Sequence, residues 1–191
     1  MSLARFKAQN HPQQVAARGE SMDSVDDRAT HPLDFGPLHD RFGFTVDVAA
    51  AAHNTKCERY YDRDTDGLAQ SWAGEVVWCN PPYSDIAPWV RKAWDEHGQA
   101  HGIVMLLPAN RTEQTWWQQM VEPYRDRPRS PLAVEFLPGR MRFLKPGQTA
   151  VGPNERPPFG CCLLIWTPPL TYRADRVTGG LFDLADTPGS R

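Results

Sequence analysis

The sequence contains no run of about 18 consecutive apolar residues, which is the length that a transmembrane helix requires. Its first residues also lack the apolar core of a secretory signal peptide, so we expect a cytoplasmic protein without a membrane segment. The formal net charge is only −2, so the surface is not basic as a whole. Any contact with nucleic acid must therefore come from a local patch of basic residues.

Cysteine and metal-ligand patterns are also sparse. The four cysteines form no Cys-x-x-Cys pair, and we expect them to be reduced, buried thiols. Acidic residues alternate over 62–66 as in a calcium loop, but Ala73 stands where the distal glutamate should be. His53 and Cys57 have no further ligands for zinc. We therefore predict no metal site and interpret the acidic stretch as a solvated turn.

The remaining pattern is typical of an α/β protein. A chain of 191 residues that is 40% hydrophobic is long enough for one domain with a sizeable core. Buried parallel strands are predicted over the apolar runs 44–50, 75–79 and 102–108. Apolar residues at helical spacing predict a helix over 85–98, and strand, helix and strand form a parallel crossover unit. The other expected elements are helices over 33–42 and 115–121, an edge strand over 56–61, strand pieces within 134–144 and a final strand over 159–166.

A proline-rich turn, Asn80-Pro81-Pro82-Tyr83, follows the second of these strands, at the edge where open α/β sheets bind ligands. The Asn80 side chain offers an amide oxygen, and the two prolines offer carbonyls without competing N–H donors. Proline makes the turn stiff, and Tyr83 adds a flat aromatic face. Such a turn is suited to hold a planar exocyclic amine, whose lone pair can attack an electrophile when acceptors draw its protons. The alternative is a rigid structural turn.

These residues also resemble a known family. Asn-Pro-Pro-Tyr is the signature of S-adenosylmethionine-dependent methyltransferases that act on planar amino groups. With the segments 44–50, 56–61 and 67–72 in the same order, the chain resembles the small phage-type, Dam-like DNA N6-adenine methyltransferases. The resemblance covers residues 30–167 and implies a single compact Rossmann-like sheet with helices on both faces. It implies methyl transfer from S-adenosylmethionine to a flipped adenine in DNA, with Asn80, Pro81, Pro82 and Tyr83 as the catalytic residues.

The resemblance also bears on organisation and setting. Residues 1–29 are expected to form a flexible N-terminal arm, and residues 168–191 a C-terminal tail with little core. The cell is expected to be bacterial or phage-infected, with a possible place in restriction–modification. Neither the target sequence nor the oligomeric state can be predicted.

Candidate cofactor residues lie around the first strand. Asp47 is expected to accept from the amino group of the methionine moiety, and the small residues Ala49 and Ala50 allow close approach. Alternatively, Asp47 is an ordinary strand-end aspartate. Thr30 is expected at the methionine end, although His31 interrupts the Thr-Pro pair of the family; alternatively, Thr30 caps a helix. Asn54 and Asp66 are further candidates, while the glycine-rich loop of larger methyltransferases is replaced by alanines.

Contacts with DNA are expected from the most basic part of the chain, residues 121–156, which has seven basic and four acidic residues. A solvated loop face is the alternative for this segment. One of Trp116 and Trp117 is a candidate to stack a base, with core packing as the alternative. The residues expected to contact DNA are Arg111, Arg125, Arg127, Arg129, Arg140, Arg142 and Lys145.

Two alternatives to the DNA adenine reaction remain open on the sequence. The first is the same chemistry on another amine, namely cytosine N4, RNA or a protein glutamine. The second is a nucleic-acid-binding module that has lost catalysis, which the missing glycine-rich loop favours.

Overall fold

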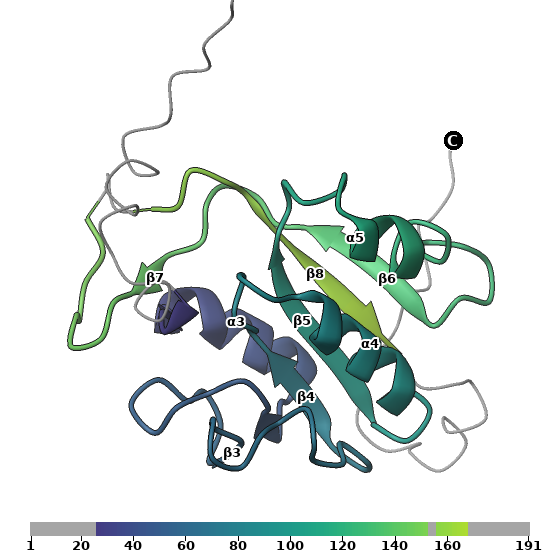
Figure 1. Cartoon of the computed structure of the whole chain (residues 1–191). Coiled ribbons are helices and arrows are strands. Elements are labelled where there is room, and N and C mark those ends of the chain that lie inside the picture. The colour runs from purple at the N-terminus through teal and green to yellow at the C-terminus, as the bar shows by residue number, and fades with distance from the viewer. Residues whose placement is uncertain (1–25, 153–155, 168–191) are drawn as a thin grey trace, which may run out of the picture.

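A mostly parallel sheet with helices on both faces forms the centre of the molecule (Figure 1). The structure, a computed structural model, describes residues 26–152 and 156–167. The tail expected over 168–191 and most of the arm expected over 1–29 lie outside the described residues. The six strands of the sheet are, in spatial order, β3 (Arg59–Tyr60), β2 (Val46–Asp47), β4 (Val76–Cys79), β5 (Gly102–Pro108), β8 (Cys161–Trp166) and β6 (Leu132–Phe136).

The strand directions agree with the predicted Rossmann-like architecture. β3, β2, β4 and β5 are parallel neighbours, so their carboxyl ends lie at one edge of the sheet. β8 runs antiparallel between β5 and β6. The predicted strand over 102–108 and the predicted strand end at Asp47 are confirmed, although β2 is shorter than the expected 44–50.

The helices divide between the two faces. α3 (Pro32–Phe42) packs Phe35 and Leu38 against one face, and it ends at Gly43 in the left-handed region, with φ of 66°. α4 (Ala87–Glu96) and α5 (Thr115–Met120) pack against the opposite face. Side chains alternate between these two cores, and the predicted opposite orientation of Cys161 and Cys162 is confirmed.

The structure decides two alternatives that the sequence left open around these helices: core packing is confirmed for the two tryptophans, and Thr30 is not a helix cap. Trp116 and Trp117 are both buried, with 7% and 1% of their surface exposed, so neither presents an open face to a base. Their indole N–H groups are also used within the chain, with Gln114 and Glu122 as acceptors. Thr30 does not cap α3, because the N-cap is His31, whose Nδ1 accepts from the Leu33 N–H at 3.1 Å.

A second, two-stranded sheet joins the N-terminal segment to the loop between β6 and β8. β1 (Ala29–Thr30) pairs antiparallel with β7 (Phe143–Leu144), and Thr30 lies opposite Phe143. The expected strand pieces within 134–144 therefore exist, but β6 joins the main sheet and β7 pairs with β1. Residues 26–29, the described part of the expected arm, are docked on the domain.

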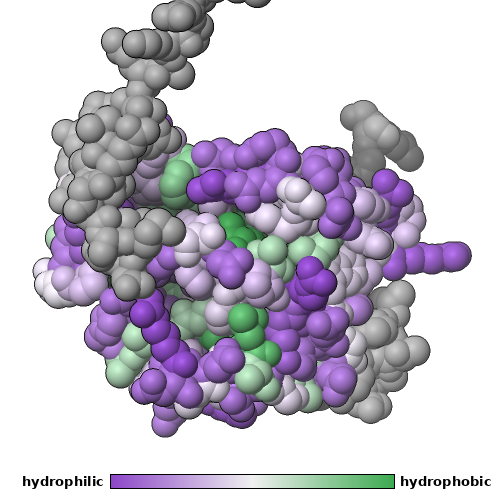
Figure 2. Space-filling model, viewed as in Figure 1, coloured by the Kyte–Doolittle hydropathy of each residue, from purple (hydrophilic) through white to green (hydrophobic). Residues whose placement is uncertain are grey.

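The outer surface shown in Figure 2 is largely hydrophilic, with apolar atoms visible in hollows near the centre of the view. Within residues 26–152 and 156–167, no helix combines the length and the apolar character needed to cross a membrane.

Candidate functional site

Asn80 and Asp47 leave the main sheet side by side. Asp47, the last residue of β2, is the Cα partner of Trp78 in β4, and Asn80 follows β4 directly. The Val48 N–H continues this pairing by donating to the Trp78 carbonyl at 3.0 Å. The predicted neighbourhood of these two strand ends is therefore confirmed.

Asp47 anchors the loop that follows β2. Its carboxylate accepts from the backbone N–H of Ala49 at 3.3 Å and from that of Lys56 at 3.0 Å. The side chain is buried, and this burial raises the pKa of Asp47 to about 6, although the two backbone hydrogen bonds and the charge of Lys56 oppose the shift. Asp47 thus performs the role of a strand-end aspartate, while it also lines a cavity described below.

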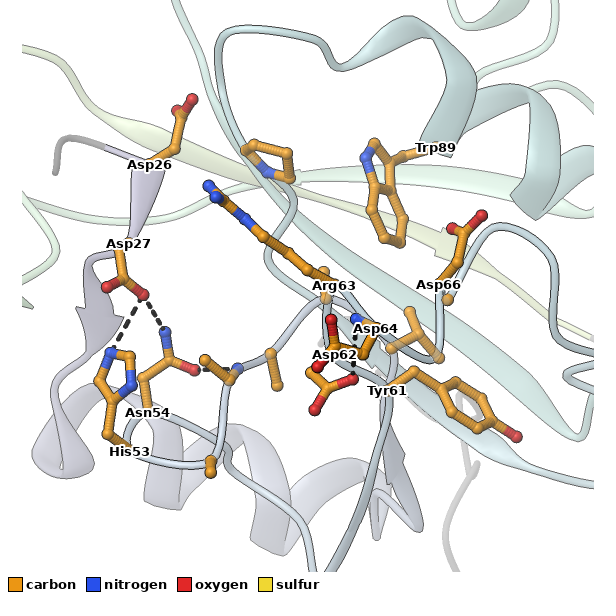
Figure 3. A pocket seen from close by; sticks show the side chains of 17 residues that line it. Asp26, Asp27, His53, Asn54, Tyr61, Asp62, Arg63, Asp64, Asp66 and Trp89 are labelled. Carbon is orange, nitrogen blue, oxygen red and sulfur yellow. Dashed lines mark hydrogen bonds and ion pairs between the residues drawn. The ribbon is translucent and has the colours of Figure 1, made fainter. Parts of the chain in front are cut away.

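A pocket of about 510 Å³ opens beyond the ends of β2 and β3 (Figure 3). Its wall includes Ala49, Ala50, Asn54 and Asp66, four of the residues that the sequence suggested for the cofactor. The indole of Trp89 faces the pocket from the start of α4. The acidic residues in the wall outnumber the basic ones, which suits a ligand with positive charge. These acidic residues are Asp26, Asp27, Asp62, Asp64 and Asp66.

A much smaller cavity, of about 20 Å³, lies between Asp47 and Asn80. Thr30 and Lys56 also line it, and Asp26, Ala49 and Asn54 belong to the walls of both cavities. The Thr30 hydroxyl and the Asn80 amide oxygen are buried, and neither has a hydrogen-bond partner within the described part of the chain. Such a volume holds about one water-sized polar group, and these two oxygens can bind it.

The rest of the proline turn faces in different directions. Pro81 is buried, whereas Pro82 lines the large pocket. The Tyr83 ring is half-buried and meets Phe143 and Phe159 edge-on, with centroids 6.2 Å away in each case. Its hydroxyl is buried without a partner among the described residues, and burial raises its pKa well above the ordinary value. Tyr83 is therefore a neutral phenol, and stacking on its ring stays a prediction.

Comparison with known proteins decides the family. Residues 20–174 match the family model described as DNA N-6-adenine-methyltransferase (Dam). The chain belongs to this family. It is similar to a DNA N-6-adenine-methyltransferase of Escherichia phage T1, with 34% identity over 113 residues, which are 58% of this chain and 43% of the phage protein. It is also similar to a DNA N-6-adenine-methyltransferase of Haemophilus phage HP1 (strain HP1c1), with 31% identity over 77 residues, 40% of this chain and 44% of that protein.

The chain spans less than half of the length of these curated relatives. Membership of the Dam family agrees with the resemblance to Dam-like methyltransferases that the sequence showed.

The basic residues expected to contact DNA fall into two groups. Arg125 pairs with Glu122 and Asp126, and Arg142 pairs with Asp34, so both are engaged within the protein. Arg127, Arg129, Arg140 and Lys145 are exposed, and Arg111 is half-buried beyond the carboxyl end of β5. Contact with DNA stays a prediction for all of these residues.

Sequence reasoning missed several residues of this Dam-family site. Asp26 and Asp27 were assigned to the arm, and their positions in the sequence carry no signal of a docked segment. Trp89 was included only in the predicted helix over 85–98, although it follows the proline turn closely. Asp62 was interpreted only as part of a turn. Its signal was its place after the predicted edge strand, because the carboxyl ends of parallel strands meet at one edge.

Proposed function

We propose that this chain transfers a methyl group from S-adenosylmethionine to the N6 amine of adenine in DNA. One observation carries the proposal: Asn80, in the Asn-Pro-Pro-Tyr turn, shares a small cavity with Asp47, directly beside a pocket of about 510 Å³. The family match and the printed names of the two phage relatives support adenine N6 as the acceptor.

The large pocket suits the adenosine part of the donor. Its volume lies within the range of roughly 300–1,000 Å³ typical of small-molecule sites. Trp89 offers a flat apolar surface to a purine, and Asp62, two residues beyond β3, stands where nucleotide-binding sheets place an acidic group for ribose hydroxyls. Hydrogen bonds from Thr65 and Asp64 lower the pKa of Asp62, so it is ionised at neutral pH. All of these bonds go to Oδ1, which leaves Oδ2 for a ligand.

The small cavity suits one charged group at the methionine end. Asp47 and Lys56 provide opposite charges on its wall, and the Thr30 hydroxyl provides an unused hydrogen-bonding group. When bound, S-adenosylmethionine supplies an electrophilic methyl group on a sulfonium, and the acidic surroundings favour that positive charge.

Asn80 and Pro81 then position the acceptor. The unpaired Asn80 oxygen and the Pro81 carbonyl can accept the two N–H bonds of the exocyclic amine and hold its lone pair in line for attack. The amine would attack the methyl carbon as the carbon–sulfur bond breaks and S-adenosylhomocysteine is released. It would lose one proton to solvent afterwards, so no strong base is required. The base must leave the duplex, which costs a few kcal/mol, and stacking on the Tyr83 ring would return about 1–3 kcal/mol.

The decisive experiment offers labelled S-adenosylmethionine and the full chain to DNA, RNA and protein in parallel. Methylated DNA is then digested to nucleosides and the product is identified by mass. We expect N6-methyl-2′-deoxyadenosine from DNA, and no methylated product from RNA or protein. Label in cytosine, RNA or protein would show that one of the alternative amines is the acceptor instead. Absence of label together with no binding heat at millimolar donor would favour a non-catalytic binding module.

A further inference from the structure

Residues Asp26–Thr30 form a wall that the two cavities share. Asp26 lines both of them, and Asp27 lines the large pocket. The Asp26 carboxylate accepts from the Ser84 hydroxyl and, at 3.3 Å, from the Ser84 backbone N–H. Because Ser84 directly follows Tyr83, this contact ties the N-terminal segment to the end of the proline turn.

Asp27 ties the same segment to a different part of the site. Its Oδ1 accepts from the Asn54 amide at 3.0 Å and lies 3.1 Å from His53 Nε2 (Figure 3). The Asn54 oxygen in turn accepts from the Ala51 N–H at 2.6 Å, so the contact continues into the loop after β2. This loop, residues 49–54, forms one side of the large pocket.

The pairing of β1 with β7 fixes where these two aspartates lie. Thr30, three residues beyond Asp27, is paired with Phe143, which in turn contacts the Tyr83 ring. The segment is therefore anchored at its carboxyl end, and its two carboxylates reach two separate walls of the site.

We propose that Asp26 and Asp27 are positioning residues with separate tasks. Asp26 acts through Ser84 to hold the Asn80–Tyr83 turn, and Asp27 acts through Asn54 to hold the loop that binds the donor. The proposal rests on the methyltransferase function proposed above. Reactive groups must be held within a fraction of an ångström, so loss of either contact should change a specific kinetic constant and not only the stability.

The test compares full-chain variants in three measurements: kcat with unmethylated genomic DNA, Kd for S-adenosylmethionine by calorimetry, and Tm. Asp26→Ala and Ser84→Ala should each lower kcat about tenfold or more, and in Ser84→Ala, which leaves the acidic wall intact, Kd should change less than about twofold. The Asp26→Ala/Ser84→Ala double variant should be no worse than Asp26→Ala, because Asp26→Ala already removes both hydrogen bonds to Ser84. Ser84→Thr keeps the hydroxyl and should restore most of the activity.

Asp27→Ala should give the opposite pattern. We expect Kd for S-adenosylmethionine to rise about fivefold or more, with kcat at saturating donor close to wild type, because the turn is still held. Asp85→Ala is the matched control, since Asp85 is exposed, adjacent to Ser84 and outside both cavity walls. It should match wild type in all three measurements.

The possible outcomes separate this inference from the proposed function. A wild-type chain that methylates no DNA would refute the proposed function. An active wild-type chain whose Asp26 and Asp27 variants keep both constants would overturn the positioning roles. The positioning roles would also be overturned if the losses in kcat added up in the Asp26→Ala/Ser84→Ala double variant. The same holds if Asp27→Ala changed the same constant as the Asp26 and Ser84 variants. If Asp26→Ala fails to fold, Ser84→Ala, which removes the hydroxyl contact and leaves Asp26 in place, provides the comparison.

Discussion

Asp47 and Trp78 are Cα partners across the parallel strands β2 and β4, and this register places Asn80 beside the acidic end of the neighbouring strand. Asp47 and Asn80 need no flexible loop to come together, because the pairing of buried strands places both of them. The small cavity between Asp47 and Asn80 is a consequence of this register. The chemistry proposed for the site depends on this relationship.

Replacement of Asn80 by alanine should abolish methyl transfer and leave the fold intact. The Asn80 oxygen has no partner within the described residues, so its removal breaks no hydrogen bond among them. We expect kcat to fall by about 100-fold or more, because the amine is no longer held in line. Labelled methyl incorporation and Tm measure the two effects. Asn110→Ala, on an exposed position beyond β5, is the control, and normal turnover by Asn80→Ala would contradict the role.

The burial of Asp47 predicts a dependence of stability on pH. Its pKa is raised from 3.8 to about 6 in the folded chain, so between about pH 4 and pH 6 only the unfolded chain has lost this proton. Stability from this group is therefore highest below about pH 4, falls as pH rises to about 6, and is constant above it. A shift of about two units corresponds to at most about 3 kcal/mol.

Asp47→Asn isolates this contribution. Asparagine can accept from only one of the two N–H groups, so the variant carries a loss that does not depend on pH. The free energy of unfolding of Asp47→Asn minus that of wild type should rise between pH 4 and pH 6 and then level off. Urea titrations at four pH values measure the difference. A difference that stays constant across this range would show that Asp47 is ionised throughout.

The sequence predicted the elements that local pattern determines. The continuous apolar run 102–108 became β5, and the alternation around Cys161 and Cys162 placed their side chains on opposite faces. Five of the six cofactor candidates, including Asn54, line one of the two cavities because they lie at or beyond strand ends that parallel pairing brings together. The sixth, Thr30, lines the small cavity from β1, which pairs with β7.

What the sequence could not supply depends on contacts between distant segments. The pairing of Thr30 with Phe143 joins parts of the chain more than a hundred residues apart, and two-residue strands carry no periodic signal. The docking of Asp26 on Ser84 has the same cause, since it requires the position of β1. Arg142 looked like a phosphate-binding residue because its partner, Asp34, is equally remote in sequence.

Arg142 is predicted to stabilise the fold without contributing to DNA binding. Its side chain and that of Asp34 are 25% and 14% exposed, so loss of the pair in Arg142→Met should lower the stability of the fold. Burial raises the pKa of Asp34, but hydrogen bonds and charge from Arg142 outweigh it, and the net pKa is lowered. The contribution is therefore present above about pH 4 and is lost as pH falls below it.

The exposed Arg140 is the matched comparison for Arg142. Arg140→Gln should leave the urea midpoint unchanged and weaken DNA binding. The magnitude of the slope of log K for DNA binding against log salt concentration should fall by about one, which corresponds to one phosphate contact. Arg142→Met should lower the urea midpoint and keep the wild-type slope. The reverse result for the two variants would assign Arg142 to the DNA contact and Arg140 to the fold.

Gly67 is predicted to be indispensable for the large pocket. A Cβ atom at this position would lie 1.9 Å from the Val48 carbonyl oxygen, which is backbone and cannot rotate away. Gly67 thus provides the close approach beside the loop after β2, where larger methyltransferases use a glycine-rich loop. Gly67→Ala should displace this loop, lower Tm by several degrees and weaken donor binding about tenfold or more. Gly36→Ala is the control, because Gly36 lies in α3 with no atom within 4 Å of the added Cβ; it should leave donor binding unchanged and keep or raise Tm. Donor binding by Gly67→Ala at wild-type affinity would refute the prediction.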